Sequence, residues 1–372
     1  MTAQPLISVC ILAGHGVASL DACLASLQGQ VRAPMFELLV GGDPGPRTLA
    51  VVESRFPQAQ LLRTVGLPPG AARNPLIEHA RGELLLFLDD DVTAEPTLLR
   101  NLQCVASEHP EATVFGGPNH TPPNSSPFEA VEGAVLSSLV GSGPVSRRYG
   151  ARRPGFADER WFTLCNLAVR RCAMAPFLSD IVCAEENALL AELHRRGDRM
   201  RYEPSLRVFH RRRAHLGAFA RQMLKYGRGR GEIMRRDRRT IRLAYFAPSA
   251  VLVYLMASPG LIAASLPAAL VLALPLVYGA LVIAAALRIA STLGRLAAAP
   301  LAAGLTIVVH ACYGAGVLRG IGTGPRRADT AWSSVTRRAV EVSRPSESPV
   351  RSRTEPGSLS HPTPEETPAR PR

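Results

Sequence analysis

Three consecutive carboxylates, Asp89, Asp90 and Asp91, follow the apolar run at residues 84–88. Like charges this close together repel one another, so a cation is expected among them. Because side chains alternate along an extended backbone, Asp89 and Asp91 point to the same side. Mg²⁺ commonly binds such carboxylates together with substrate phosphates. The triplet therefore predicts a metal–phosphate site, with a solvated acidic turn or a helix N-cap at Asp91 as the alternative.

Two further segments carry groups that suit a phosphorylated substrate. Gly70 precedes Arg73 and Asn74 at an expected helix start, where backbone N–H groups and a guanidinium attract anions. Glu185 and Glu186 begin another expected helix. The helix dipole favours carboxylates there whatever the function, although a carboxylate in a cleft can also act as a general base. Taken alone, each segment is better explained by its position at a helix start than by a functional role.

Alternating strands and helices surround these residues. Strands are expected at residues 6–13, 36–40, 60–63 and 83–88, and helices at 17–28 and 71–80. This alternation predicts an α/β fold with a parallel sheet covered by helices on both faces. Ligands of such sheets bind beyond the carboxyl ends of the strands. The aspartate triplet falls at one of those ends.

A second part of the chain, residues 241–320, is strongly apolar and predicts a membrane region of two to three helices. The run at residues 241–290 is long enough for two spans of about 20 residues each. A turn is expected near residues 258–260 or at Pro267. The stretch at residues 296–318 predicts either a third span or an interfacial helix.

Basic residues predict how this region is oriented. Five arginines precede the first apolar run and keep the N-terminal part in the cytoplasm under the positive-inside rule: Arg235, Arg236, Arg238, Arg239 and Arg242. Arginines 326, 327, 337 and 338 place the chain end on the same side, whereas three full spans would place it opposite. The conflict favours two spans plus an interfacial helix, or a miscounted span. Residues 321–372, rich in Pro, Ser and Arg, predict a disordered tail.

The net charge of +13 over 372 residues suits nucleic acid, an anionic membrane or an anionic substrate. Aromatic residues are only 5% of the chain and do not interleave with the basic run, as a nucleic-acid stacking platform would require. Most of that run adjoins the apolar region, where it suits anionic lipid headgroups. No cysteine pair has C-x-x-C spacing, which argues against a zinc site. We therefore expect membrane lipids, and no nucleic acid, as partners.

In this order, the polar segments resemble family-2 glycosyltransferases, which have a GT-A fold. The resemblance covers about residues 5–235 and rests on Ser8-Val-Cys-Ile-Leu12, the strand ending at Asp43, Ala72-Arg73-Asn74, Asp89-Asp90-Asp91, Asn166-Leu-Ala-Val-Arg170-Arg171, Glu185-Glu186 and Tyr226-Gly-Arg228-Gly. The chain departs from the family pattern at residues 13–16, which replace the usual Pro-x-Tyr/Phe-Asn. Gly42 stands where an aspartate is common, and Glu186 replaces an aspartate. The processive Gln-x-x-Arg-Trp motif is absent, which favours adding one or a few sugars.

The resemblance implies a mixed, Rossmann-like α/β sheet of the GT-A type in residues 1–235, followed by C-terminal transmembrane helices. It implies an inverting, metal-dependent hexosyl transfer from a nucleotide-diphosphate sugar to a hydroxyl of a lipid-linked or cell-envelope glycan acceptor. The cofactor would be Mg²⁺ or Mn²⁺. The protein would lie in the inner (plasma) membrane as a multi-pass protein with a cytoplasmic catalytic domain. The alternative is a non-catalytic nucleotide-sugar-binding relative that acts in an envelope assembly complex.

The same resemblance assigns roles to individual residues. Asp91 and Asp89 would hold the metal, and Glu186, with Glu185 beside it, would be the catalytic base. The implied substrate-binding residues are Asp43, Arg73, Asn74, Asp89, Asn166 and Arg228. Four histidines could line the cleft, although surface or packing roles are commoner for each: His15, His120, His210 and His215.

Overall fold

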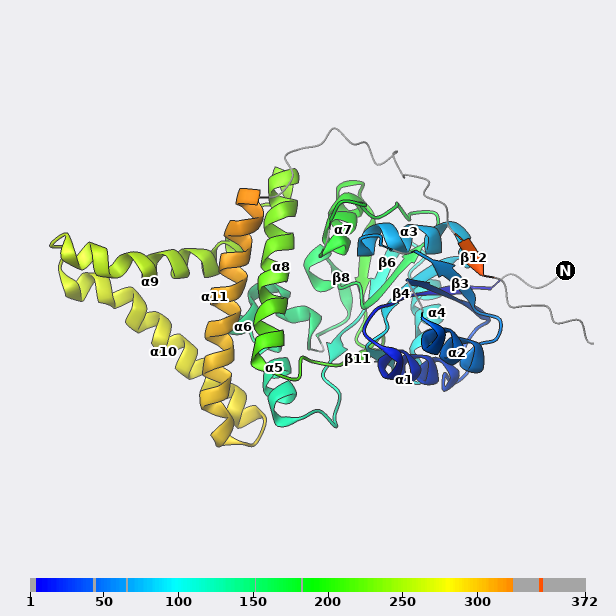
Figure 1. The fold of residues 1–372 in the computed structure, drawn as a ribbon, viewed down its shortest axis with the longest axis horizontal. Helices are drawn as coiled ribbons and strands as arrows, with labels where there is room; N and C mark the ends of the chain where they lie inside the picture. Colours follow the sequence, from blue (N-terminus) through cyan, green and yellow to red (C-terminus); the bar gives the residue numbers. More distant parts are fainter. Residues whose placement is uncertain are drawn as a thin grey trace, which may run out of the picture.

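The computed structural model of this protein describes residues 5–42, 45–64, 66–150, 152–181 and 183–323, and the backbone of residues 341–343. The expected disordered tail, residues 321–372, lies outside these residues except for the end of helix α11 (Ala299–Thr323) and the short strand β12 (Glu341–Ser343). In Figure 1 the sheet and its covering helices form one half of the molecule. Helices α8 (Leu216–Arg236) and α11 stand side by side next to it.

A mixed sheet forms the centre of the N-terminal part. Its strands run in the order β12-β3-β2-β1-β4-β9-β6-β10-β8. The bounds are β1 (Ile7–Ala13), β2 (Phe36–Gly42), β3 (Gln60–Arg63), β4 (Leu84–Asp89), β6 (Ala112–Gly116), β8 (Gly155–Ala157), β9 (Asn166–Arg170) and β10 (Arg199–Tyr202). Strands β3, β2, β1 and β4 are parallel, as the sequence pattern predicts, but β9 runs antiparallel between β4 and β6. The expected mixed sheet is thereby confirmed.

Helices cover both faces of the sheet because the central strands are apolar on both sides. Leu84, Leu86 and Leu88 of β4 pack in one core and Leu85 and Phe87 in another, as the alternation of side chains requires. The first face carries α1 (Val17–Gln28), α2 (Pro46–Arg55) and α4 (Leu98–Glu108). The second carries α3 (Pro69–His79) and α7 (Glu185–Arg195). The helix expected at residues 71–80 therefore begins two residues earlier, with Pro69 in its first turn.

A small second sheet follows the aspartate triplet directly. It consists of β5 (Val92–Ala94), β11 (Val208–His210) and β7 (Asn119–His120), in the order β5-β11-β7. Strand β11 runs antiparallel to β5, with His210 opposite Val92. This register brings His210 next to the residue before Val92, which is Asp91.

Shorter elements connect the sheet to the C-terminal helices. They are α5 (Pro127–Ser137), α6 (Leu139–Ser142) and the 3-10 turns η1 (Gly143–Arg148), η2 (Glu159–Trp161), η3 (Arg238–Thr240), η4 (Leu243–Tyr245) and η5 (Leu296–Ala298). A capping box starts α5: Ser126 accepts from the Glu129 backbone N–H, and the Glu129 carboxylate accepts from the Ser126 backbone N–H. Helix α5 thus begins at a position that the local sequence fixes.

The apolar region forms three helices. Helices α9 (Ala247–Ala263) and α10 (Ala268–Thr292) make a hairpin that projects from the body in Figure 1, while α11 lies against α8. The turn falls at residues 264–267, so the expectation at Pro267 is confirmed and that at residues 258–260 is wrong, because Pro259 lies inside α9. Two helical segments of the described chain, Ala268–Thr292 and Leu296–Thr323, are long and apolar enough to cross a membrane. Helix α9, with 17 residues, is shorter.

Glycines allow the close contact between α8 and α11. A Cβ atom added at Gly316 of α11 would overlap the carbonyl oxygen of Leu224 in α8. A Cβ atom at Gly231 of α8 would likewise overlap the carbonyl oxygen of Val317. Small residues four apart on both helices therefore let the two backbones approach each other. As a result, α11 is joined to α8 along much of its length.

Candidate active site

Strands β1, β2 and β4 are parallel, so their carboxyl ends lie at the same edge of the sheet. Asp89 is the last residue of β4, and Asp90 and Asp91 form the turn that leads into β5. Because a strand follows Asp91, the alternative of a helix N-cap there is wrong. Asp90 and Asp91 are both buried, which also argues against a solvated acidic turn.

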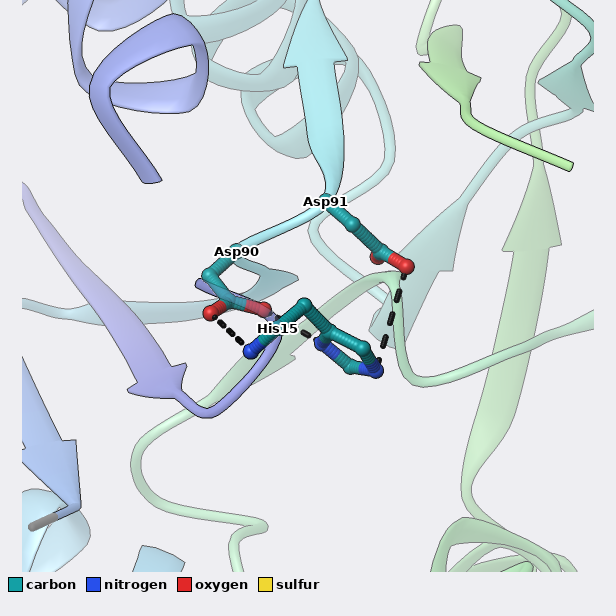
Figure 2. Close-up of side chains that lie close together, drawn as sticks. All are labelled: His15, Asp90 and Asp91. Atoms are coloured by element: carbon teal, nitrogen blue, oxygen red, sulfur yellow. Dashed lines mark hydrogen bonds and ion pairs between the residues drawn. The ribbon is translucent and has the colours of Figure 1, made fainter. Parts of the chain in front are cut away.

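Asp90 holds the loop that follows β1 (Figure 2). Its Oδ2 accepts hydrogen bonds from the backbone N–H groups of Gly14 at 2.7 Å and His15 at 2.8 Å. Its Oδ1 lies 2.5 Å from His15 Nδ1. The segment at residues 13–16, where the chain departs from the family pattern, is thus fixed by the middle aspartate of the triplet.

Asp91 and His210 form the most buried polar pair at this edge. His210 Nε2 lies 3.1 Å from Asp91 Oδ1, and His15 Nε2 lies 3.9 Å from Asp91 Oδ2. Burial opposes ionisation of Asp91, but the charge of His210, together with His15 and Arg213, outweighs it and holds the Asp91 pKa well below its usual range. Apart from this contact with His210, Asp91 Oδ1 has no partner among the described residues. A buried, ionised oxygen beside an imidazole is a candidate position for a metal ligand.

The residues at this position fit a divalent cation. Asp89, Asp91 and His210 each offer one ligand atom, and these atoms lie within 4.8 Å of one another. Two carboxylates and one imidazole make a mixed oxygen and nitrogen set. Such a set suits Mn²⁺ better than Mg²⁺, which prefers oxygen ligands alone.

Arg73 links the aspartate edge to helix α7. Its Nη2 donates to Asp89 Oδ1 at 3.1 Å, and its Nη1 donates to Glu185 Oε1 at 2.5 Å. The guanidinium is buried, so both carboxylates are held by one charge that solvent barely screens. Three of the residues that the sequence assigned to the site therefore lie in direct contact.

Asn74, the next residue of α3, bonds to the backbone and not to a carboxylate. Its Nδ2 donates to the carbonyl oxygen of Phe177 at 2.9 Å, and its Oδ1 accepts from the Phe177 backbone N–H at 2.7 Å. Both amide atoms are thus occupied by the backbone of the segment that leads to α7. This contact positions the loop before Glu185 and leaves no free amide atom for a substrate.

Glu186 lies in a buried polar network at the start of α7. Asn187 Nδ2 donates to Glu186 Oε1 at 2.9 Å, and Arg148 Nη1 lies 3.6 Å from the same oxygen. Arg148 and Arg230 both donate to Asn187 Oδ1, at 2.8 Å and 2.7 Å. Burial raises the pKa of Glu186, and the charge of Arg148 opposes that rise. The Glu186 carboxyl is therefore more basic than an exposed one, and the Arg148 guanidinium stabilises its ionised form.

The remaining assigned residues are less directly involved. Asn166 opens β9 opposite Leu88, one residue before Asp89, and its Nδ2 donates to the Leu206 carbonyl oxygen at 2.6 Å. Arg228 is half exposed and pairs with Glu232 of its own helix at 2.7 Å. Asp43 lies outside the described residues. Among the histidines, His215 caps α8 through Ala218 N–H and His120 stacks near Phe209, so only His15 and His210 adjoin the aspartates.

Sequence reasoning did not find Glu132, which lines a small cavity of about 40 Å³ together with Asp89 and His210. Glu132 lies on α5, and its Oε2 accepts from the Arg213 backbone N–H at 3.0 Å. Burial raises the pKa of Glu132 to about 7, against the opposing charge of Arg212. The surrounding sequence of α5 is apolar, so only the packing of that helix reveals the position of this carboxyl.

Comparison with a solved structure confirms the expected GT-A type of fold. Residues 8–166 match the sequence model of the family described as Glycosyl transferase family 2. Among solved structures, the mannosyltransferase PcManGT from Pyrobaculum calidifontis, in complex with GDP-Man and Mn²⁺, is similar. It is 18% identical, with a TM-score of 0.55 over 82% of this chain and 88% of that one. S. aureus TarS, residues 1–349, is 17% identical, with a TM-score of 0.42 over 84% of this chain and 91% of that one. No curated protein sequence is significantly similar to this chain.

Proposed function

We propose that this chain, in which residues 8–166 form a family 2 glycosyltransferase domain, transfers a sugar from a nucleotide-diphosphate sugar to a hydroxyl of a lipid-linked or cell-envelope glycan acceptor. One observation carries the proposal. Asp91 and His210 lie side by side at the carboxyl edge of the sheet, and Arg73 connects this edge to the paired carboxylates of α7. The arrangement offers a cation site for a diphosphate and a base for an acceptor within one connected network.

Asp89, Asp91 and His210 would hold the cation, with Mn²⁺ favoured over Mg²⁺ by the imidazole ligand. When bound, the ion supplies positive charge against the leaving diphosphate. Asp90 keeps the loop after β1 in place beside it. Asp43 stays the proposed nucleoside contact, and Arg73 orients Asp89 toward the cation.

Glu186 is the proposed base. It would take the proton from the acceptor hydroxyl as that oxygen attacks the anomeric carbon in line, which inverts the configuration. Its burial favours proton uptake, and Arg148 stabilises the ionised form before the reaction. Glu185 is paired with Arg73 and so would position the site instead of accepting a proton. The pairing of Arg228 with Glu232 favours a helix-stabilising role for Arg228 over phosphate binding.

The membrane would be reached by the α9–α10 hairpin. Residues 243–287 contain no Asp, Glu, Lys or Arg, and apolar side chains such as Leu276 and Met256 point away from the protein. The packing of α11 along α8 favours an interfacial α11 over a third independent span. Both ends of the region would then lie on the cytoplasmic side, as their arginines require, at the inner membrane.

The test is release of nucleoside diphosphate by membranes that contain the protein, with Mn²⁺ and UDP-, GDP- and dTDP-sugars as donors. GDP-mannose is included because the similar PcManGT structure holds GDP-Man. A lipid extract serves as acceptor. Asp91→Asn and Glu186→Gln are compared with Glu192→Gln, a surface residue of the same helix that pairs with Arg195.

Release from one donor that is lost in Asp91→Asn, in Glu186→Gln and on chelation, but kept in Glu192→Gln, would support the proposal. Metal-dependent donor binding without release from any donor would instead support the non-catalytic alternative. That alternative keeps Asp89 and Asp91 as binding residues and gives Glu186 no chemical role.

A further inference from the structure

A cavity of about 400 Å³ lies where the catalytic half meets the apolar helices. It is closed by α5 and α6 together with α8 on one side and by α9, α10 and α11 on the other. Its lining includes Leu136, Val140, Met223, Val251, Leu281 and Val309. Its volume falls within the range of about 300–1,000 Å³ that is usual for small-molecule sites.

The polar groups in its wall are largely occupied by each other. Tyr278 Oη lies 2.9 Å from His310 Nδ1, and His310 Nε2 lies 2.7 Å from the carbonyl oxygen of Val140. These contacts join α10, α11 and α6 and satisfy both nitrogens of the imidazole. What remains open to an occupant is mainly hydrocarbon surface, which favours an apolar ligand.

The cavity adjoins the small cavity at the candidate active site. Leu136, Tyr149 and Tyr226 line both this cavity and the small one that Asp89 and His210 line. At that junction the Arg212 guanidinium lies 5.1 Å from the centre of the Tyr149 ring. An occupant of the cavity would thus have its inner end at a fixed positive charge, close to the proposed cation site.

We propose that this cavity, the acceptor-tail cavity, holds the hydrocarbon chain of a lipid-linked glycan acceptor, in which a phosphate joins the chain to the sugar that carries the acceptor hydroxyl. The chain enters from the bilayer between the hairpin helices, and the phosphate reaches the junction at Tyr149 and Arg212. The identity of the occupant as an acceptor rests on the proposed function, whereas the binding of a hydrocarbon chain does not. The apolar outer surface of α9 and α10 keeps this entrance within the membrane.

Photolabelling of the full-length protein in detergent tests the site. The probe is a long-chain prenyl phosphate that carries a diazirine in its chain, and labelled residues are mapped by mass spectrometry. Label is expected on cavity-lining residues of α6, α9, α10 or α11, and unlabelled long-chain prenyl phosphate should compete for it. Label confined to outer faces of α9 and α10 would overturn the inference.

Two matched pairs of variants test the cavity. In each pair one substitution fills the cavity and the other changes a residue outside its lining. Val251→Trp places an indole in the cavity, whereas Val253→Trp changes a residue of the same helix that is 52% exposed and lies outside the lining. Leu281→Trp and Ile283→Trp repeat the comparison on α10, where Ile283 is 58% exposed and outside the lining. In Val251→Trp and in Leu281→Trp the cavity should lose space for about two methylenes, which should weaken labelling about ten-fold. Equal labelling within both pairs would overturn the inference.

Measurements of nucleotide-sugar binding and of transfer to a short-chain acceptor distinguish this inference from the proposed function. Val251→Trp and Leu281→Trp should keep metal-dependent nucleotide-sugar binding and also transfer to a short-chain, water-soluble acceptor. Only the KM for the long-chain acceptor should rise. Cavity labelling without any nucleotide-sugar binding would refute the proposed function and leave a lipid site. Transfer to long-chain acceptors that is unchanged in both variants would refute the acceptor-tail cavity alone.

Discussion

His210 places its imidazole Nε2 3.1 Å from Oδ1 of Asp91, although the two residues come from strands that are distant in the chain. The pairing of β11 with β5 creates this contact. Asp89 offers a third ligand atom within 4.8 Å of the other two, so these three residues together fit a cation.

His210→Ala should therefore weaken Mn²⁺ binding. Loss of groups that only orient a ligand already costs about 10–100-fold in metal affinity, and a direct ligand should cost at least as much. Calorimetric titration of Mn²⁺ in the presence of nucleoside diphosphate measures the effect. His120→Ala, in the neighbouring strand β7, is the control and should bind as wild type does. Equal affinities for both variants would remove His210 from the metal site.

Arg73→Leu should destabilise the fold strongly, because it leaves the buried Glu185 and the partly buried Asp89 without their shared cation. Breaking a buried ion pair from one side costs about 3–5 kcal/mol. Arg73→Lys should recover part of the loss, since an ammonium cannot hold both carboxylates in the geometry of a guanidinium. Chemical unfolding in detergent gives the free energies. Arg55→Leu, which breaks the exposed pair with Asp21, should have a much smaller effect, and a comparable loss there would contradict this account.

Gly316→Ala should separate α11 from α8, because the new methyl group meets the Leu224 carbonyl oxygen. Gly304→Ala, on the same helix, adds its methyl group in open space and should stabilise α11 by up to about 1 kcal/mol through helix propensity. Thermal unfolding should thus move in opposite directions for the two variants. A similar shift for both would show that the contact between these helices does not contribute to stability.

Glu132→Gln should make stability less dependent on pH. Burial raises the Glu132 pKa from 4.5 to about 7, so the folded state binds the proton more tightly than the unfolded state does. The free energy of unfolding of wild type should then fall as pH rises from about 4.5 to 7, by roughly 1–3 kcal/mol relative to the variant. Denaturation at pH 4.5 should show no difference between them, and at pH 8 the variant should be the more stable. Parallel curves across this range would mean that Glu132 ionises freely in the folded protein.

Much of the fold follows from local sequence. Alternating apolar runs predicted β1 to β4 and helix α1, and the run of three aspartates marked the carboxyl edge of the sheet. These features depend on neighbours in the chain, so one sequence is enough to find them. His210 is different, since only the antiparallel pairing of β11 with β5 brings it to Asp91.

Two other features depend on packing between helices. Hydropathy alone could not predict that α11 packs along α8, because a spanning helix is equally long and apolar; the glycine contacts of α11 show this packing. On α8, the resemblance assigns substrate binding to Arg228, which is half exposed, whereas Arg230 is buried and donates to Asn187 Oδ1. Packing against α7 and α11 determines which face of α8 is buried. A sequence motif carries no information about that packing.

Stereochemistry tests the role of Glu186 most directly. With a donor whose sugar has the α configuration, NMR spectra recorded early in the reaction give the configuration of the first product. Direct attack assisted by Glu186 predicts a β-linked product from wild type and almost none from Glu186→Gln. An α-linked product, or unchanged turnover by Glu186→Gln, would contradict a single displacement with Glu186 as the base.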